Sequence, residues 1–265
     1  MNEIDLRPEH RTILAELTIL KDLYLTLVLK LQELNDTVKP NLEAMYAVKI
    51  GEKELGLFQK QAEVAGLKYK MELMIACINR QQKIDLGEID ETAQDMLEEY
   101  YERIYAEAKR IGQAEDRLAH LMKPADSLAL KKLYYEAAKL LHPDINPNLT
   151  PEQKELWNVI SEAYKNGDIQ TVRNVRKAID GMYDAPGISY NYDALKAEVE
   201  LFKERNNAML RKISEIEEEF PFTFREKLDD ETWLKSEYLI FEKKMQELNE
   251  TAKKYVDYID LMTEN

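Results

Sequence analysis

The sequence is poor in the residues that interrupt helices, cross-link chains or bind metals. Its 265 residues include only eight glycines, eight prolines, three histidines and one cysteine, Cys77. A single cysteine excludes an intramolecular disulfide and a four-cysteine zinc site, and it fits a reducing compartment, so we expect a cytoplasmic protein. Few glycines and prolines beside abundant Leu, Glu, Lys and Ala predict long, uninterrupted helices.

The sequence also lacks an excess of positive charge and a long apolar run. Its net charge is -14, whereas general binding to nucleic acid or to an anionic membrane needs a Lys/Arg excess on the contacting surface. The most apolar stretch, residues 13–31, contains two acids and two lysines, which argues against a signal peptide or a membrane span. We therefore expect neither nucleic acid nor membrane as a partner.

Apolar residues recur with alternating spacings of four and three, a pattern typical of helices that pack as coiled coils. One such seam covers residues 13–34, and two more long helices are expected over residues 42–78 and 89–121. Polar residues and Pro40 follow the first seam, so we expect antiparallel helices joined by short turns throughout residues 1–114. Further apolar residues beside the first seam indicate that this helix packs against more than one neighbour.

The last part of the chain repeats this pattern, with seams over residues 195–216 and 234–259. We expect an antiparallel hairpin over residues 190–265, preceded by a hinge at the stretch DAPGIS, residues 184–189. Asn206 occupies a seam position, where a polar residue fixes helix register at some cost in stability. The predicted fold is therefore all-α, with elongated antiparallel helical or coiled-coil arms that flank a small central segment.

The central segment, residues 115–182, differs because its predicted helices are short and have clear ends. One helix is expected from about residue 127 to 141, since Pro143 forces the residue before it out of the α region. The sequence Thr-Pro-Glu-Gln, residues 150–153, is typical of an N-cap, a first-turn proline and a capping box, so the next helix begins there. The tripeptide His-Pro-Asp, residues 142–144, stands between the two helices.

Two short helices joined by a loop that begins with His-Pro-Asp are the arrangement of a J domain, and the sequence resembles that family over roughly residues 115–180. The resemblance rests on KKLYYEAAKLLHPDINP, residues 131–147, and LWNVISEAYKNGD, residues 156–168. In that family the loop and the basic face of the preceding helix bind the ATPase domain of an Hsp70 chaperone and stimulate ATP hydrolysis. The resemblance therefore implies a co-chaperone without a cofactor of its own, whose helical arms bind a client, another protein or a second copy.

The resemblance also identifies the candidate Hsp70-binding residues. They are His142, Pro143, Asp144, Asn146, Lys131, Lys132 and Lys139. Proline presets the loop backbone, which reduces the entropy lost on binding, and an exposed Asp144 suits a charge-assisted pair with an arginine. The helix before the loop has three lysines against one acid, Glu136, and this local reversal of charge suits an acidic partner surface. The same lysines also fit an ordinary solvated helix face, with Lys132 paired to Glu136.

The segment departs from the family pattern at several positions. Tyr135, Glu136 and Leu140 stand where J domains commonly carry basic residues, and Ile145 follows the tripeptide where lysine or arginine is usual. The family's opening Tyr-x-x-Leu-Gly is missing as well. The expected substitute for a first J-domain helix lies at the end of the third long helix, at Leu118 and Leu121.

Other interpretations of these residues stay open. His-Pro-Asp also fits an ordinary turn, in which proline ends a helix and aspartate bonds to nearby amides. The alternative hypothesis is therefore a coiled-coil scaffold or assembly protein that retains an inactive J-like fold. His10 and His120 are isolated, so no metal site is expected. The sequence has no phosphate-binding glycine loop, nucleophile elbow or paired His/Glu spacing, which argues against an enzyme.

Overall fold

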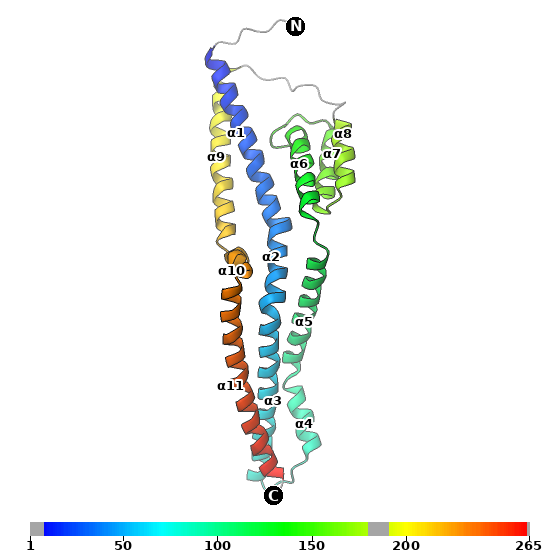
Figure 1. The fold of residues 1–265 in the computed structure, drawn as a ribbon, viewed down its shortest axis with the longest axis vertical. Coiled ribbons are helices and arrows are strands. Elements are labelled where there is room, and N and C mark those ends of the chain that lie inside the picture. The colour runs from blue at the N-terminus through cyan, green and yellow to red at the C-terminus, as the bar shows by residue number, and fades with distance from the viewer. Residues whose placement is uncertain (1–7, 180–190, 264–265) are drawn as a thin grey trace. The chain divides into compact units, whose positions relative to one another are not determined.

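The computed structural model describes residues 8–179 and 191–263, and within these ranges it contains helices and turns but no strand (Figure 1). The predicted all-α class is confirmed. The expected hinge at residues 184–189 lies outside the described residues. The chain divides into two compact units, of which unit 1 comprises residues 1–40 and 121–222 and unit 2 comprises residues 41–120 and 223–265. Both units therefore join stretches that are distant in the sequence.

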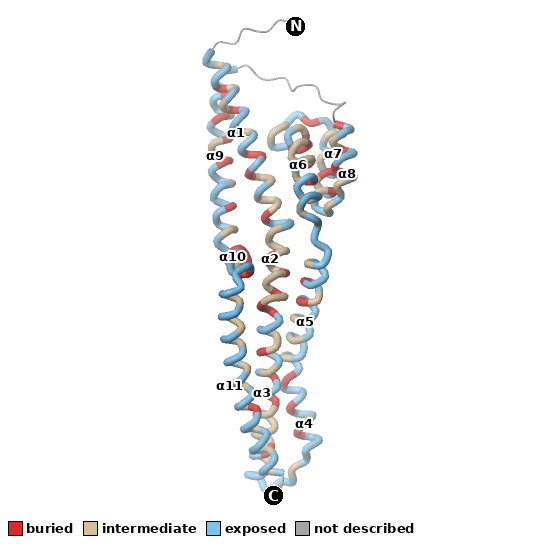
Figure 2. Tube along the Cα trace, viewed as in Figure 1, coloured by how far each residue is buried: buried red, intermediate tan, exposed pale blue. Residues whose placement is uncertain are grey.

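Unit 1 contains a parallel pair of long helices, α1 (Pro8–Glu33) and α9 (Tyr192–Glu217). Their direction follows from contacts at the two ends, where His10 packs on Tyr192 with 5.1 Å between ring centroids and Lys30 lies 3.2 Å from Glu217. The residues buried between the helices (Figure 2) all belong to the predicted seams. They are Ile13, Leu17, Tyr24, Leu195, Val199 and Phe202.

Asn206 lies in this seam, as predicted, and is 3% exposed. Its Nδ2 donates a hydrogen bond of 3.1 Å to the carbonyl oxygen of Leu20 on α1. Because a buried amide is costly without its partner, sliding one helix along the other loses this bond. Asn206 therefore favours the observed register of α1 and α9.

The other helices of unit 1 are α6 (Pro124–Leu141), α7 (Pro151–Lys165) and α8 (Ile169–Ile179), and each packs on the other two. The predicted capping box is confirmed at Thr150 and Gln153, whose side chains each accept the other's backbone N–H. Helix α8 was not predicted; Asp168 caps it by accepting two backbone N–H groups. The shared core consists of Leu130, Tyr134, Ala137, Leu141, Ile160, Ala163, Val172, Val175 and Ile179.

Unit 2 is built around α3 (Glu52–Asn79). The helix packs against α11 (Glu231–Thr263) on one side and against α4 (Leu86–Asp95) and α5 (Glu98–Ala119) on the other (Figure 1). Helices α4 and α5 reverse direction after α3, as expected, whereas α11 runs parallel to α3. Two shorter helices, α2 (Lys39–Tyr46) and α10 (Arg225–Asp229), complete the unit.

Two predicted connections are wrong. The backbone stays helical from Pro8 to Asn79 through two short π-helices, Leu34–Val38 and Ala47–Gly51, where a turn near Pro40 was expected. A π-helical segment absorbs an irregularity in hydrogen bonding without ending the helix. The two helices of the predicted hairpin over residues 190–265 belong to different units, where α9 packs on α1 and α11 packs on α3. A seam describes the apolar face of a helix and does not specify which helix covers it.

Candidate functional site

The His-Pro-Asp tripeptide forms the corner between α6 and α7. Helix α6 ends at Leu141, and His142 adopts an extended backbone with φ -68° and ψ 121°, as expected for a residue before proline. The carbonyl oxygen of His142 accepts the backbone N–H groups of Ile145 at 3.1 Å and of Asn146 at 2.9 Å. These bonds close the turn, so the loop has one defined backbone conformation.

The ring of His142 is directed into the chain and is 7% exposed. It contacts the edge of Trp157 on α7, with 4.8 Å between ring centroids, and its Nδ1 accepts the backbone N–H of Asp144 at 3.2 Å. Burial lowers the pKa of His142 below its ordinary value, and the Asp144 carboxylate offsets this shift only in part. A neutral ring with Nδ1 as acceptor carries its proton on Nε2. His142 therefore stabilises the corner through contacts of its buried ring within the chain.

The remaining corner residues either hold the loop in place or are exposed to solvent. Asn146 donates from Nδ2 to the carbonyl oxygen of Lys139 at 3.0 Å, which ties the loop to the last turn of α6. Pro143 and Asp144 are exposed. Within the tripeptide, these two residues are the ones accessible from solvent.

The Asp144 carboxylate already has a partner within the chain. It accepts a hydrogen bond of 2.9 Å from the hydroxyl of Tyr24 on α1. The Tyr24 ring lies in the seam of α1 and α9, where it meets Phe202 edge-on at 5.5 Å. Burial and the bond to Asp144 raise the pKa of Tyr24 to about 12, so the hydroxyl keeps its proton at neutral pH. The group expected to meet an arginine of Hsp70 thus meets a residue of α1.

The three candidate lysines have different surroundings. Lys131 pairs with Glu33, and Lys139 lies 3.1 Å from Asp22; both acids belong to α1. The hydrogen bond to Asp22 raises the pKa of Lys139. Lys132 is exposed. Two of the three basic groups therefore contact α1 and one faces solvent.

The positions that depart from the J-domain pattern make contacts inside unit 1. Ile145 packs against the core between α1 and α9, and Leu140 packs against the core of α6, α7 and α8. The Tyr135 hydroxyl lies 3.4 Å from the hydroxyl of Thr26 on α1. Glu136 lies 3.6 Å from Arg176 of α8. Side chains that bind within the chain occupy the places where the family carries basic residues.

Helix α1 also takes the place that we expected the end of the third long helix to fill. Leu118 packs in unit 2 near Ile111, and Leu121 is 48% exposed. Instead, Leu29 of α1 packs on the core of α6, α7 and α8, and Gln32 accepts a hydrogen bond of 3.2 Å from the buried hydroxyl of Tyr134. Leu29 was among the apolar residues beside the first seam, and these residues indicated that the helix packs against more than one neighbour.

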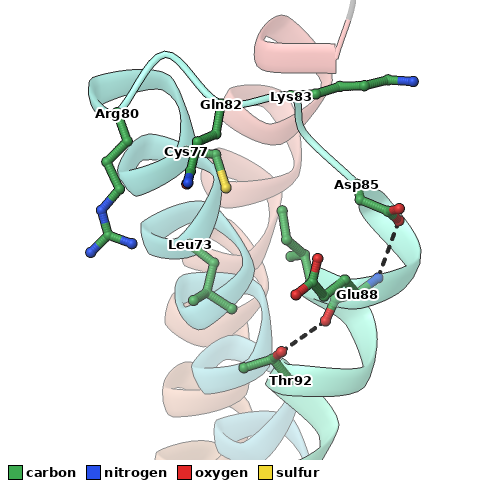
Figure 3. A pocket seen from close by; sticks show the side chains of 9 residues that line it. Leu73, Cys77, Arg80, Gln82, Lys83, Asp85, Glu88 and Thr92 are labelled. Atoms are coloured by element: carbon green, nitrogen blue, oxygen red, sulfur yellow. Dashed lines mark hydrogen bonds between the residues drawn. The ribbon is translucent and has the colours of Figure 1, made fainter.

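A separate hollow of about 390 Å³ lies at the turn between α3 and α4 in unit 2 (Figure 3). Two of its polar side chains bond to the backbone of Glu88: Asp85 accepts the backbone N–H of Glu88, and Thr92 donates to the carbonyl oxygen of Glu88 at 2.8 Å. Cys77 also lines the hollow. No group of His, Cys, Asp and Glu side chains suited to a metal occurs in the part of the chain that the structure describes.

Comparisons with protein-family models, with curated proteins and with solved structures give no match for this chain. None of the described helices combines the length and apolar character that crossing a membrane requires. The sequence around the tripeptide and the geometry of the corner are therefore the features that indicate a function.

Proposed function

We propose that the chain is a J-domain-type co-chaperone, which binds an Hsp70 (DnaK-like) chaperone at the corner between α6 and α7 and stimulates its ATP hydrolysis. The observation that carries this proposal is the corner itself, where His-Pro-Asp joins two packed helices in a closed turn with Asp144 at the surface. The hydrolysis takes place in Hsp70, so the chain needs no catalytic group or cofactor. Its single cysteine supports a cytoplasmic location.

The physical basis of binding is a rigid turn that presents one carboxylate beside a basic helix. Proline and the two bonds to the His142 carbonyl hold the loop, so little backbone entropy is lost when a partner binds. A carboxylate at that position suits a charge-assisted pair with an arginine. The lysines of α6 favour approach of an acidic surface, which acts mainly on the association rate.

The second candidate function is a scaffold with an inactive J-like fold. The observation that favours it is the engagement of Asp144 and Lys139 by α1, because these groups are already paired inside the chain. A scaffold would use its long helices instead. Helix α11 offers large apolar side chains on its exposed surface, among them Leu239 (65% exposed) and Leu261 (58% exposed). Such side chains suit a client, a partner protein or a second copy of the chain.

The deciding experiment is single-turnover ATP hydrolysis by the Hsp70 of the same organism, with wild-type protein and with Asp144→Asn. Asp144 is exposed, so this substitution removes a charge without creating a cavity. His142→Gln is also included in the series, but it replaces a buried ring. His120→Gln, at an exposed position in unit 2, is the matched control.

We expect wild type and His120→Gln to stimulate hydrolysis equally and Asp144→Asn to lose stimulation while its circular dichroism is unchanged. Equal stimulation by Asp144→Asn would exclude a J-domain mechanism. No stimulation by folded wild type at any concentration would favour the scaffold.

A further inference from the structure

Helix α1 contacts several of the groups that the proposed function assigns to Hsp70. Asp22, Thr26 and Glu33 lie on one face of α1, whereas the Tyr24 ring lies in the seam with α9 and its hydroxyl reaches Asp144. Their partners on the corner and on α6 include the exposed acid of the tripeptide and two of the three lysines. In the order of the α1 residues, these partners are Lys139, Asp144, Tyr135 and Lys131.

The contacts are complementary in charge and in hydrogen bonding. Helix α1 offers carboxylates to the lysines and a hydroxyl donor to the carboxylate of Asp144. An Hsp70 surface that binds the same groups must also offer acids to the lysines and a donor to Asp144. The Tyr24 hydroxyl donates to Asp144 Oδ2 at 2.9 Å and so uses part of the acceptor capacity that the proposed function assigns to an arginine of the partner. Helix α1 and Hsp70 therefore compete for the same atoms.

Apolar contacts hold the polar ones in place. Ile145, directly after the tripeptide, packs against the core between α1 and α9 at a position where the J-domain pattern has a basic residue. The Tyr24 ring is fixed by Phe202 on one side and by the Arg205 guanidinium at 5.8 Å on another. Helix α9 thus positions α1 against the corner.

The ion pairs of this contact are partly exposed. The side chains of Lys139 and Asp22 are 41% and 51% exposed, and those of Lys131 and Glu33 are 37% and 31% exposed. Ion pairs at such exposure contribute little each because water and salt screen them. Releasing the Hsp70-binding groups requires the loss of the Tyr24–Asp144 and Thr26–Tyr135 hydrogen bonds, two partly exposed ion pairs and the packing of Ile145. Full separation of α1 would also break the Gln32–Tyr134 hydrogen bond and the packing of Leu29.

We propose that α1 is an autoinhibitory helix, which engages part of the Hsp70-binding surface through Asp22, Tyr24, Thr26 and Glu33 and must release these groups before Hsp70 binds. The proposal rests on the proposed function and adds regulation of the same site. Only the chains in which α1 has released these groups bind Hsp70, so the apparent affinity is the intrinsic affinity multiplied by the fraction of such chains. Weakening the contact therefore increases the apparent affinity.

The test is the apparent Kd of the full chain for ATP-bound Hsp70. Tyr24→Phe removes the hydroxyl that binds Asp144 and keeps the ring on Phe202, and its loss shifts the ratio of closed to open chains by about fivefold. We therefore expect its Kd to be up to about fivefold lower than that of wild type. Glu16→Gln is the matched control, because this α1 acid faces Lys203 of α9 at 3.0 Å, and its Kd should equal that of wild type.

A crosslink tests the same contact from the opposite direction. Thr26→Cys and Tyr135→Cys, combined in a Cys77→Ser chain and joined by a short bis-maleimide, hold α1 on α6. We expect the crosslink to form readily and to abolish most Hsp70 stimulation, while the same chain before crosslinking remains active.

The outcomes separate this proposal from the proposed function. If Tyr24→Phe binds Hsp70 no better than wild type, or if the crosslinked chain stimulates fully, autoinhibition is wrong while the co-chaperone function stands. If wild type, Tyr24→Phe and Asp144→Asn all fail to stimulate hydrolysis, the co-chaperone function is wrong and autoinhibition falls with it. The crosslinking yield then reports separately whether α1 lies on the corner.

Discussion

The hydrogen bond between Tyr24 and Asp144 joins α1 to the corner and is measurable without Hsp70. The perturbation is a double-mutant cycle of Tyr24→Phe, Asp144→Asn and both together. Hydrogen bonds to charged groups contribute roughly 1.5–3 kcal/mol. Asp144 is exposed, and water competes for its oxygens, so we expect a coupling free energy of about 1 kcal/mol.

The two tryptophans make this cycle specific for unit 1. Trp157 belongs to unit 1 and Trp233 belongs to unit 2, so a Trp233→Phe chain has a single fluorescent reporter on α7. Urea unfolding followed by this reporter gives the free energy of unfolding of unit 1 for each variant. Such a reporter is needed because a chain with two units does not have to unfold in one step.

The control cycle combines Asp144→Asn with Tyr192→Phe, which changes a tyrosine that packs on His10 near the start of α1. We expect additive effects there, as is usual for distant sites. A coupling free energy between Tyr24 and Asp144 below about 0.3 kcal/mol would refute the contact, since this is the scatter found for independent positions.

Two further predictions concern single positions. His142 should titrate below 6.5, measured by NMR of its ring proton, because burial disfavours the imidazolium. Unit 1 should thus be fully stable above about pH 6.5 and lose stability as the pH falls toward the folded-state pKa of His142. If the free energy of unfolding followed at Trp157 shows no decrease over this pH range that depends on His142, the prediction is wrong. Gly112→Ala should stabilise unit 2 by up to about 1 kcal/mol because α5 has open space there, whereas Gly167→Ala should destabilise unit 1 by about 1 kcal/mol because Gly167 has φ +71°. Denaturant unfolding checks both, and a reversed sign would contradict the argument.

Helix ends in the central segment were predictable because their signals are local. Pro143 ends α6, and Thr150 with Gln153 begins α7, through bonds between neighbours in the sequence. Apolar seams were equally visible, and the buried residues of α1 and α9 follow them.

The pairing of the long helices was not predictable from these seams. An apolar stripe with the same spacing fits a parallel or antiparallel neighbour, near or distant in the sequence. Short turns between helices favour antiparallel neighbours, and that expectation fails for α9 and α11 because each packs on a helix far earlier in the chain. The polar residues near position 36 likewise suggested a turn, where a π-helix continues the backbone.

The candidate site was predictable in its position but not in its surroundings. The tripeptide and the lysines of α6 are visible in the sequence, whereas Tyr24, 120 residues before Asp144, is visible only as a seam residue. Asp22 was likewise visible only as a charged residue that interrupts an apolar stretch. Contacts at such separation depend on tertiary packing, which leaves no local pattern. They also account for Tyr135 and Ile145, whose departure from the J-domain pattern had no explanation in the sequence.

The most direct test of the account is to map where Hsp70 contacts the full chain, by amide hydrogen exchange with and without saturating ATP-bound Hsp70. We expect slower exchange at the corner, residues 142–146, and at the adjoining last turn of α6. Asp144→Asn should remove this protection. Protection confined to the long helices of unit 2, or no protection anywhere at saturating Hsp70, would contradict the central claim.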